Sequence, residues 1–220
     1  MRYLGLALYA EGATDYRFLS PLLLRLCEDI CLRHASQPVD VSGVLALDDR
    51  PGMRKMPREE RIADAALDAD GSWDVLFVHS DGEGDPARAV RERIAPALTR
   101  LRNTGLLHAE GVAVVPVRET EAWVLTDGDA LRAVFGVSLD DAALGLPAPG
   151  AVVESVANPK KRLDLAFAAT RPGGRRARAG AAPLLNALGE RVSLPQLRAV
   201  PSFRAVENDL IAALRRLGLL

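Results

Sequence analysis

The sequence predicts an α/β protein in which helices flank a parallel β-sheet and further helices follow it. Four short apolar runs alternate along the chain with longer segments in which apolar residues recur at helical spacing. Three of these runs end in acidic turns, as expected where buried parallel strands pass into βα loops. The pattern therefore places a series of strand, loop and helix units in the first two thirds of the chain.

The overall composition is that of a globular chain without a strong net charge. The 220 residues are 49% hydrophobic and 26% charged, and the formal net charge is -1. No global basic field attracts nucleic acid, so any such binding needs local basic patches. No apolar run is long enough to span a bilayer, and the apolar segment at the N-terminus is too short for a secretory signal. We therefore expect a cytoplasmic protein with no membrane partner.

The first unit consists of a strand over residues 3–10 and a long amphipathic helix. Glu11 follows the strand directly, and Gly12 permits a tight turn. We expect Thr14 to cap the helix. Glu11 is of interest because it should lie on the same sheet edge as the carboxylates that follow the third strand.

The second unit is predicted as a strand over 39–47 and a helix over 58–69. The basic, proline- and glycine-containing segment 50–61 lies between the strand and the body of the helix, and its cationic side chains are candidates for phosphate contacts. Such charge runs are more often simply solvated, and Glu59 and Glu60 dilute this one.

The third unit contains the most distinctive stretch of the sequence. A strand over 75–78 is followed by Asp81, Glu83 and Asp85, with glycines between them. Carboxylates crowded at the carboxyl end of a parallel strand repel each other, and a hard cation such as Mg²⁺ relieves that repulsion. We expect Asp81 and Glu83 to bind metal. Asp85 is expected to cap the helix that Pro86 opens.

The fourth strand is predicted over 112–117, and its end is also acidic. Glu119 and Glu121 follow it, and a helix is expected over 121–135, with Asp127 and Asp129 as candidate caps for its second half. Three strands thus end in carboxylates, and every βα loop of a parallel sheet opens at the same edge. This arrangement predicts a cation site.

The remainder of the chain is predicted to be helical. We expect a domain over 1–150, irregular from 138 onwards, and a helical extension over 151–220 packed on it, ending in an amphipathic helix over 202–217. The extension is basic in two places. The residues concerned are Lys160, Lys161, Arg162, Arg175, Arg176 and Arg178.

Several other residues favour structural roles over chemical ones. Cys27 and Cys31 lie on one helix face, but the sequence has no second ligand pair for zinc, so buried free thiols are expected. Trp73 and Trp123 are expected in the core. His79 is a candidate base or ligand, but a buried, hydrogen-bonded histidine is the expected state.

Five segments together resemble a Toprim-related family of unknown function called DUF4276. They are EGATD, HSDGEGD, PVRETEAW, ANPKKRL and PSFRAVENDL, in that order along nearly the whole chain. The resemblance implies a Toprim-like Rossmannoid fold, as in topoisomerases, primases and OLD-type nucleases. Glu11 matches the glutamate after the first Toprim strand, and Asp81 and Glu83 match the acidic pair after the third. That pair is usually Asp-x-Asp, so Glu83 is a departure.

The resemblance implies phosphodiester cleavage of DNA or RNA with Mg²⁺ or Mn²⁺, with anti-phage defence as its biological setting. Asp81 and Glu83 would bind metal, and Glu11 would be a further ligand or the general base. Glu119 or Glu121 would complete a second metal site. The six basic residues of the extension would hold the phosphate backbone.

Two other readings compete with a nuclease. One is a non-catalytic Toprim-like scaffold that binds an ATPase, nucleic acid or nucleotide. The resemblance to OLD-type systems implies an ATPase partner, which would be a separate subunit because the chain has no Walker motif. A small-molecule phosphotransfer enzyme is the third reading. The sequence has neither a nucleophilic aspartate motif nor a glycine-rich phosphate loop to support it.

Overall fold

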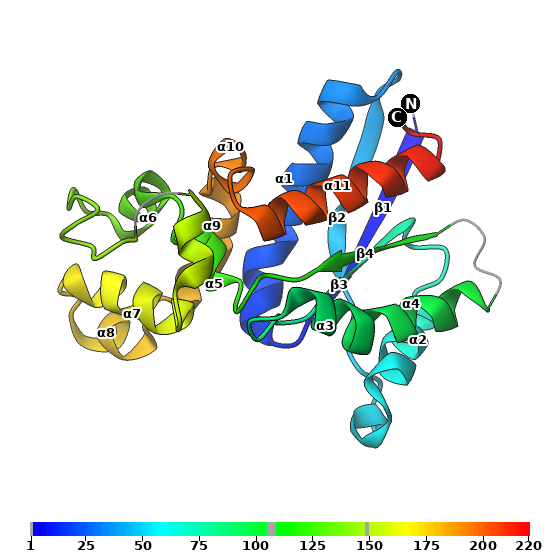
Figure 1. Ribbon diagram of the computed structural model, residues 1–220, viewed down its shortest axis with the longest axis horizontal. Helices are drawn as coiled ribbons and strands as arrows, with labels where there is room; N and C mark the ends of the chain where they lie inside the picture. The colour runs from blue at the N-terminus through cyan, green and yellow to red at the C-terminus, as the bar shows by residue number, and fades with distance from the viewer. Residues whose placement is uncertain (1, 105–108, 148–149) are drawn as a thin grey trace.

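The computed structural model describes residues 2–104, 109–147 and 150–220, and it confirms an α/β fold. Its sheet has four parallel strands in the order β2-β1-β3-β4 (Figure 1). Each predicted strand is present, with its ends displaced by at most three residues. The strands are β1 (Arg2–Tyr9), β2 (Val39–Ala46), β3 (Val75–His79) and β4 (Glu110–Val114).

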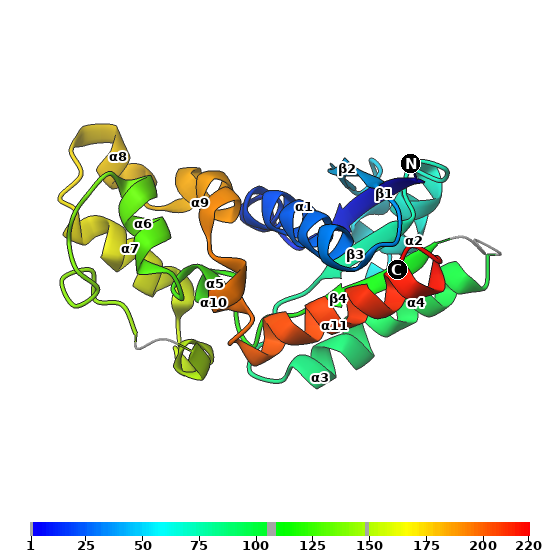
Figure 2. The same cartoon turned by 90° about the horizontal axis from the view of Figure 1, so that it is seen from above.

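Helices cover both faces of this sheet. Helices α1 and α11 pack on one face, and α2 and the α3–α4 segment pack on the other (Figure 2). These helices are α1 (Ala13–His34), α2 (Arg58–Asp68), α3 (Pro86–Ala89), α4 (Ala95–Arg102) and α11 (Pro201–Arg216).

The strands divide the apolar core into two layers. Leu4, Leu6 and Leu8 of β1 face α1, whereas Ala7 and Tyr9 face α2, as the period of two along a strand requires. All five residues of β3 are buried, because this strand lies between β1 and β4 and under helices on both faces.

The predicted helix over 86–102 is present but irregular. A π-helical segment, Val90–Ile94, separates α3 from α4. Pro96 has no backbone N–H and cannot make the regular bond to residue 92, and a π-turn accommodates that loss. The expected cap is confirmed: Asp85 Oδ1 accepts a hydrogen bond of 2.9 Å from the backbone N–H of Arg88.

The predicted single helix over 121–135 is wrong, because two helices occupy this stretch. They are α5 (Glu121–Val124) and α6 (Gly128–Phe135). Asp127 starts the second helix, with Oδ1 accepting from Ala130 N at 2.9 Å, and its Oδ2 accepts from Ser193 N at 2.8 Å. The cap interrupts the helix and ties it to the C-terminal segment.

Short helices gather at one end of the molecule, and α11 returns from there along the sheet (Figures 1 and 2). The apolar layer on the α1 side includes residues of these helices as well as of the sheet, so the two parts share a core. The elements are η3 (Gly150–Ser155), α7 (Pro159–Ala169), α8 (Gly174–Ala179), η4 (Ala182–Leu184), α9 (Leu185–Arg191) and α10 (Leu194–Leu197).

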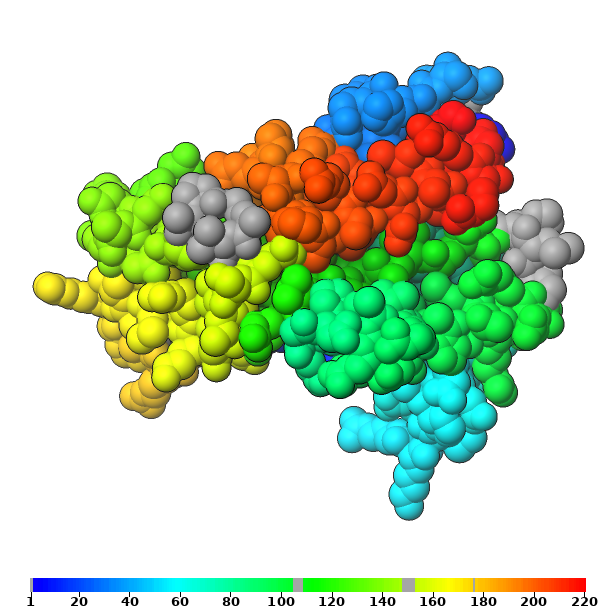
Figure 3. All heavy atoms as spheres, in the orientation of Figure 1, coloured from blue at the N-terminus to red at the C-terminus, as the bar shows by residue number. Residues whose placement is uncertain are grey.

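Several individual residues and one irregular segment lie as the sequence predicts. Trp73 and Trp123 are buried, and Cys27 and Cys31 are buried free thiols, as predicted. Between 138 and 147 the backbone forms turns without helix or strand, as expected. The segment with η1 (Met53–Lys55) projects from the body (Figure 3). In the described ranges, no helix has the length and apolar character needed to cross a membrane.

Candidate functional site

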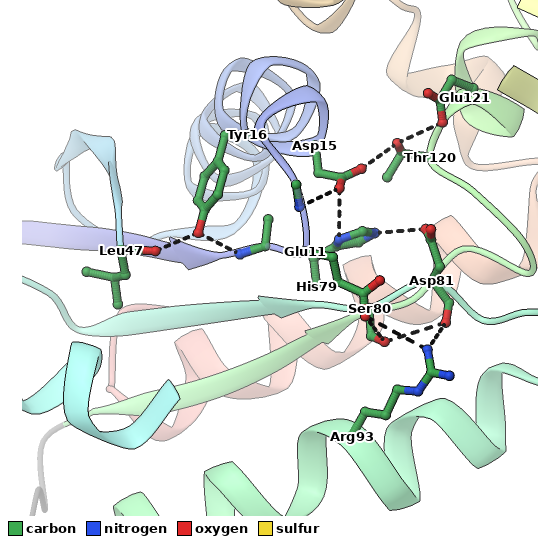
Figure 4. A network of polar contacts seen from close by, with 12 residues as sticks. Glu11, Asp15, Tyr16, Leu47, His79, Ser80, Asp81, Arg93, Thr120 and Glu121 are labelled. Atoms are coloured by element: carbon green, nitrogen blue, oxygen red, sulfur yellow. Dashed lines mark hydrogen bonds and ion pairs between the residues drawn. The ribbon is translucent and has the colours of Figure 1, made fainter. Parts of the chain in front are cut away.

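Polar side chains from the ends of β1, β3 and β4 meet at one edge of the sheet (Figure 4). Glu11 follows β1, His79 is the last residue of β3, and Asp81 comes two residues later. Thr120 and Glu121 lie in the segment after β4, and Thr120 contacts Asp15 at the start of α1. This is the edge at which open parallel sheets bind ligands.

Backbone contacts hold the loop after β3 against the segment after β4. Ser80 N, Gly82 N and Gly84 N donate to the carbonyl oxygens of residues 114, 116 and 117 at 3.2, 3.1 and 2.7 Å. A Cβ at position 82 would lie 2.3 Å from the carbonyl oxygen of Pro116. Glycine is therefore required for this close approach.

Glu11 is surrounded by groups that stabilise its charge. Ser80 Oγ donates a hydrogen bond of 2.8 Å to Glu11 Oε1. The same oxygen lies 3.6 Å from a guanidinium nitrogen of Arg58 and 3.8 Å from one of Arg93. Arg93 also approaches the backbone oxygen of Asp81 at 3.4 Å. Ser80 Oγ also lies 3.5 Å from the backbone oxygen of Asp81, so Glu11 and Asp81 have Ser80 and Arg93 as common neighbours.

His79 lies between two carboxylates. Its Nδ1 is 3.8 Å from Asp15 Oδ2, and its Nε2 is 3.5 Å from Asp81 Oδ1. The side chain is fully buried, yet neither ring nitrogen has a hydrogen-bond partner among the described residues, and neither does Asp81 Oδ1. The histidine is buried as predicted, but the part of the chain that the structure describes provides no hydrogen bond to either ring nitrogen.

Asp15 is a site residue that the sequence reasoning missed. The first turn of α1 is capped at Gly12 and not at Thr14: the carboxylate of Asp15 accepts from Gly12 N at 3.1 Å. Its other oxygen accepts from Thr120 Oγ1 at 3.1 Å. Burial, reinforced by the charge of Asp81, raises the pKa of Asp15 although His79 opposes the shift. The available signal was an acidic residue three positions after a glycine cap.

Glu83 does not join this cluster. Its carboxylate is exposed and forms ion pairs with Arg93 at 2.8 Å and Arg88 at 3.4 Å. Its backbone is left-handed, with φ of 49°, which places it at the tip of the turn. Arg88 and Arg93 therefore form ion pairs with Glu83, the carboxylate that was expected to bind metal.

The two glutamates after β4 have different surroundings. Glu119 Oε2 accepts from Lys160 N at 3.0 Å and so binds the first turn of α7. Glu121 is buried, and Thr120 Oγ1 lies 3.4 Å from its Oε2. Burial and the nearby carboxylates of Asp15 and Glu119 raise the pKa of Glu121 to about 7.

The basic residues of the extension gather only in part. Lys160, Lys161 and Arg178 line a groove of about 670 Å³, and Glu121 lines the same groove. Arg162 and Arg175 are exposed and do not line it. The side chain of Arg176 lies outside the described residues.

Two residues from the basic segment 50–61, Arg58 and Arg61, reach the sheet edge. Arg58 donates to the carbonyl oxygen of His79 at 2.7 Å, and its guanidinium lies over the ring of Tyr9, 5.6 Å from the centroid. Arg61 lines the same cavity as Glu11 but pairs with Asp49 at 2.8 Å, and Arg50 pairs with Asp64. Among the described residues, Arg58 and Arg93 are thus the cations that pair with Glu11.

The donor atoms at this edge suit a divalent cation. Asp15, His79 and Asp81 each offer a ligand atom within 4.8 Å of the others. Carboxylate and imidazole donors with unsatisfied atoms are the groups that such a cation would satisfy. No family model, no curated protein and no solved structure matches the chain.

Proposed function

We propose that this protein hydrolyses phosphodiester bonds in DNA or RNA with the aid of a divalent cation. The observation that carries the proposal is the convergence of Glu11 and Asp81 at the carboxyl edge of the sheet, with Ser80 and Arg93 as shared neighbours. The ordered resemblance to Toprim-related proteins supports the same chemistry. Glu83 is left out of the cation site because Arg88 and Arg93 pair with it.

Each residue at this edge has a role in such a reaction. Mg²⁺ or Mn²⁺ held by Asp81 would neutralise the non-bridging oxygens and polarise the attacking water. Glu11 would accept the proton of that water, since its side chain is partly open to solvent and, among the described residues, accepts a hydrogen bond only from Ser80. The water oxygen bonds to phosphorus, the P–O bond to the leaving group breaks, and the leaving oxygen takes a proton from solvent. Arg58 and Arg93 would offset the added negative charge.

Substrate would extend from the sheet edge towards the basic groove. Lys160, Lys161 and Arg178 line that groove, and Glu121 connects it with the polar cluster. Exposed lysines and arginines contact phosphates without reading bases, so this surface supports binding that depends on salt more than on sequence. The proposal therefore takes DNA and RNA backbones as one substrate class.

A non-catalytic binding protein is the alternative, and one observation favours it. Glu83 and Glu119 are engaged in structural contacts, so fewer free carboxylates surround Asp81 than the resemblance implies. In that case the sheet edge would bind phosphate-containing partners without cleaving them.

The decisive experiment incubates the protein with plasmid DNA, a linear duplex and an RNA oligomer, in Mg²⁺ and in Mn²⁺. We expect cleavage by the wild-type chain, and rates reduced about 10²–10⁴-fold by Glu11→Gln and at least as strongly by Asp81→Asn. Glu92→Gln is the matched control, because Glu92 is exposed and pairs only with the neighbouring Arg91 in the described structure. Full activity in both site variants would reject the proposal, and binding without cleavage by wild type would favour the alternative.

A further inference from the structure

The buried imidazole of His79 requires an explanation that the fold alone does not supply. The ring is fully shielded from solvent at the end of β3, and neither nitrogen has a hydrogen-bond partner within the described ranges. Asp81 Oδ1, which is also buried and accepts no hydrogen bond from the described residues, faces Nε2 from 3.5 Å. Buried polar atoms are rarely left in this state, and a bound ion that satisfies them is one of the standard explanations.

The separation of these two atoms fits two ligands of one cation. Ligand atoms about 2.1 Å from a common metal in tetrahedral geometry are about 3.4 Å apart. His79 Nε2 and Asp81 Oδ1 are 3.5 Å apart, which is long for a hydrogen bond between them. Both atoms are therefore placed as a chelating pair.

Asp15 lies on the side of the ring where the orienting carboxylate of a metal-bound histidine is found, at an ion-pair distance that is too long for a hydrogen bond. It lies 3.8 Å from Nδ1, the ring nitrogen away from Asp81. Gly12 N and Thr120 Oγ1 fix its two oxygens, so its position does not depend on His79. A carboxylate on the second nitrogen sets the tautomer and leaves Nε2 free to bind metal.

We propose that His79 and Asp81 bind a divalent transition-metal ion, with Asp15 orienting the histidine. An imidazole nitrogen suits Zn²⁺ and similar ions, whereas Mg²⁺ prefers oxygen ligands alone. The inference rests on the proposed function for the catalytic use of the ion, but binding itself is measured without substrate. It changes the expected cofactor from Mg²⁺ to a metal that accepts nitrogen, and the expected ligand pair from Asp81 and Glu83 to His79 and Asp81.

The test titrates the full chain with Zn²⁺, Mn²⁺ and Mg²⁺ by calorimetry. We expect Zn²⁺ to bind at least about tenfold more tightly than Mg²⁺. Binding should be lost in His79→Gln and Asp81→Asn and weakened about 10–100-fold in Asp15→Asn. Glu92→Gln is the control that removes an exposed carboxylate. Circular dichroism of each variant establishes that it is folded before its binding is compared.

A second measurement needs no variant of the buried histidine. Pulsed electron paramagnetic resonance of the Mn²⁺-loaded wild type should show coupling to a ¹⁴N nucleus of the imidazole. No binding of Zn²⁺ or Mn²⁺, absence of nitrogen coupling, or a loss of binding in Glu83→Gln with retention in His79→Gln would each overturn the inference. If His79 is instead an imidazolium that pairs with both carboxylates, neither Zn²⁺ nor Mn²⁺ should bind. Metal binding without cleavage would reject the proposed function and leave this inference standing.

Discussion

Glu121 is a buried carboxyl group whose protonation is linked to folding. Its pKa is raised from 4.5 to about 7, mainly by burial. Because the folded-state pKa is the higher one, the unfolded chain ionises first as the pH rises, and stability is lost between about pH 4.5 and 7. The loss amounts to about 3 kcal/mol at most, and it is complete above that window.

Glu121→Gln should therefore remove this pH dependence. With metal chelated, we expect the variant to gain stability over wild type as the pH increases from 4.5 to 8, and to gain none below that range. Urea unfolding at several pH values measures the difference. Parallel curves for the two proteins across the whole range would contradict the assignment.

The contact between the loops after β3 and β4 depends on Gly82. A Cβ there would meet two backbone oxygens, of Pro116 and Val117, at 2.3 and 2.7 Å, and backbone gives way only by shifting the loop. We expect Gly82→Ala to lower the free energy of unfolding by about 1–3 kcal/mol and to displace Asp81. Thermal unfolding and metal titration measure the two effects.

Gly43 provides the matched control for this substitution. It lies in β2, and a Cβ added there meets nothing within 4 Å. Gly43→Ala should change stability by no more than about 0.5 kcal/mol. Equal effects of the two substitutions would show that the close approach at Gly82 is not what limits the loop.

The elements of the sheet were predictable because their signals are local. Each strand is a short apolar run with a sharp end, and the long apolar face of α1 has helical spacing throughout. The break between α5 and α6 was predictable only in part. Asp127 is a residue type that often caps helices, but its hydrogen bond with Ser193 joins residues far apart in the sequence. Long-range contacts of this kind have no periodicity to reveal them.

The candidate site was less predictable than the sheet. Glu11 and Asp81 could be placed from strand order alone, since both follow strands that end at one edge. The position of the Glu83 carboxylate could not be predicted in this way, because it depends on ion pairs with Arg88 and Arg93 from the next helical segment. Asp15 resembled an ordinary helix-start residue, and only the fold places it against His79.

At the scale of the whole molecule, a network of charged groups joins the first helix to the last. Arg198, after α10, pairs with Asp29 of α1 and with Glu207 of α11, the latter at 2.8 Å. Arg33 adds a contact of 3.1 Å to Glu207. Burial alone would raise the pKa of Asp29, but the hydrogen bond and charge of Arg198 outweigh it and lower the pKa.

Asp29→Asn should destabilise the protein at neutral pH and not in strong acid. A lowered pKa means that the ionised form stabilises the fold above the unfolded value of 3.8, and that this stability is lost as the pH falls through the folded-state pKa. Melting temperatures of wild type and variant should differ at pH 7 and converge below pH 3.8. A constant difference at both pH values would show that the network does not depend on this charge.

The position of β3 at the centre of the sheet also determines how its backbone amides should exchange with deuterium. This strand is hydrogen-bonded on both edges and covered on both faces, so its N–H groups should reach solvent only when the whole molecule opens. The edge strand β2, with no wholly buried residue, should exchange earlier through local fraying. Since His79 is the last residue of β3, the base of the candidate site would then be anchored to the slowest-exchanging part of the protein.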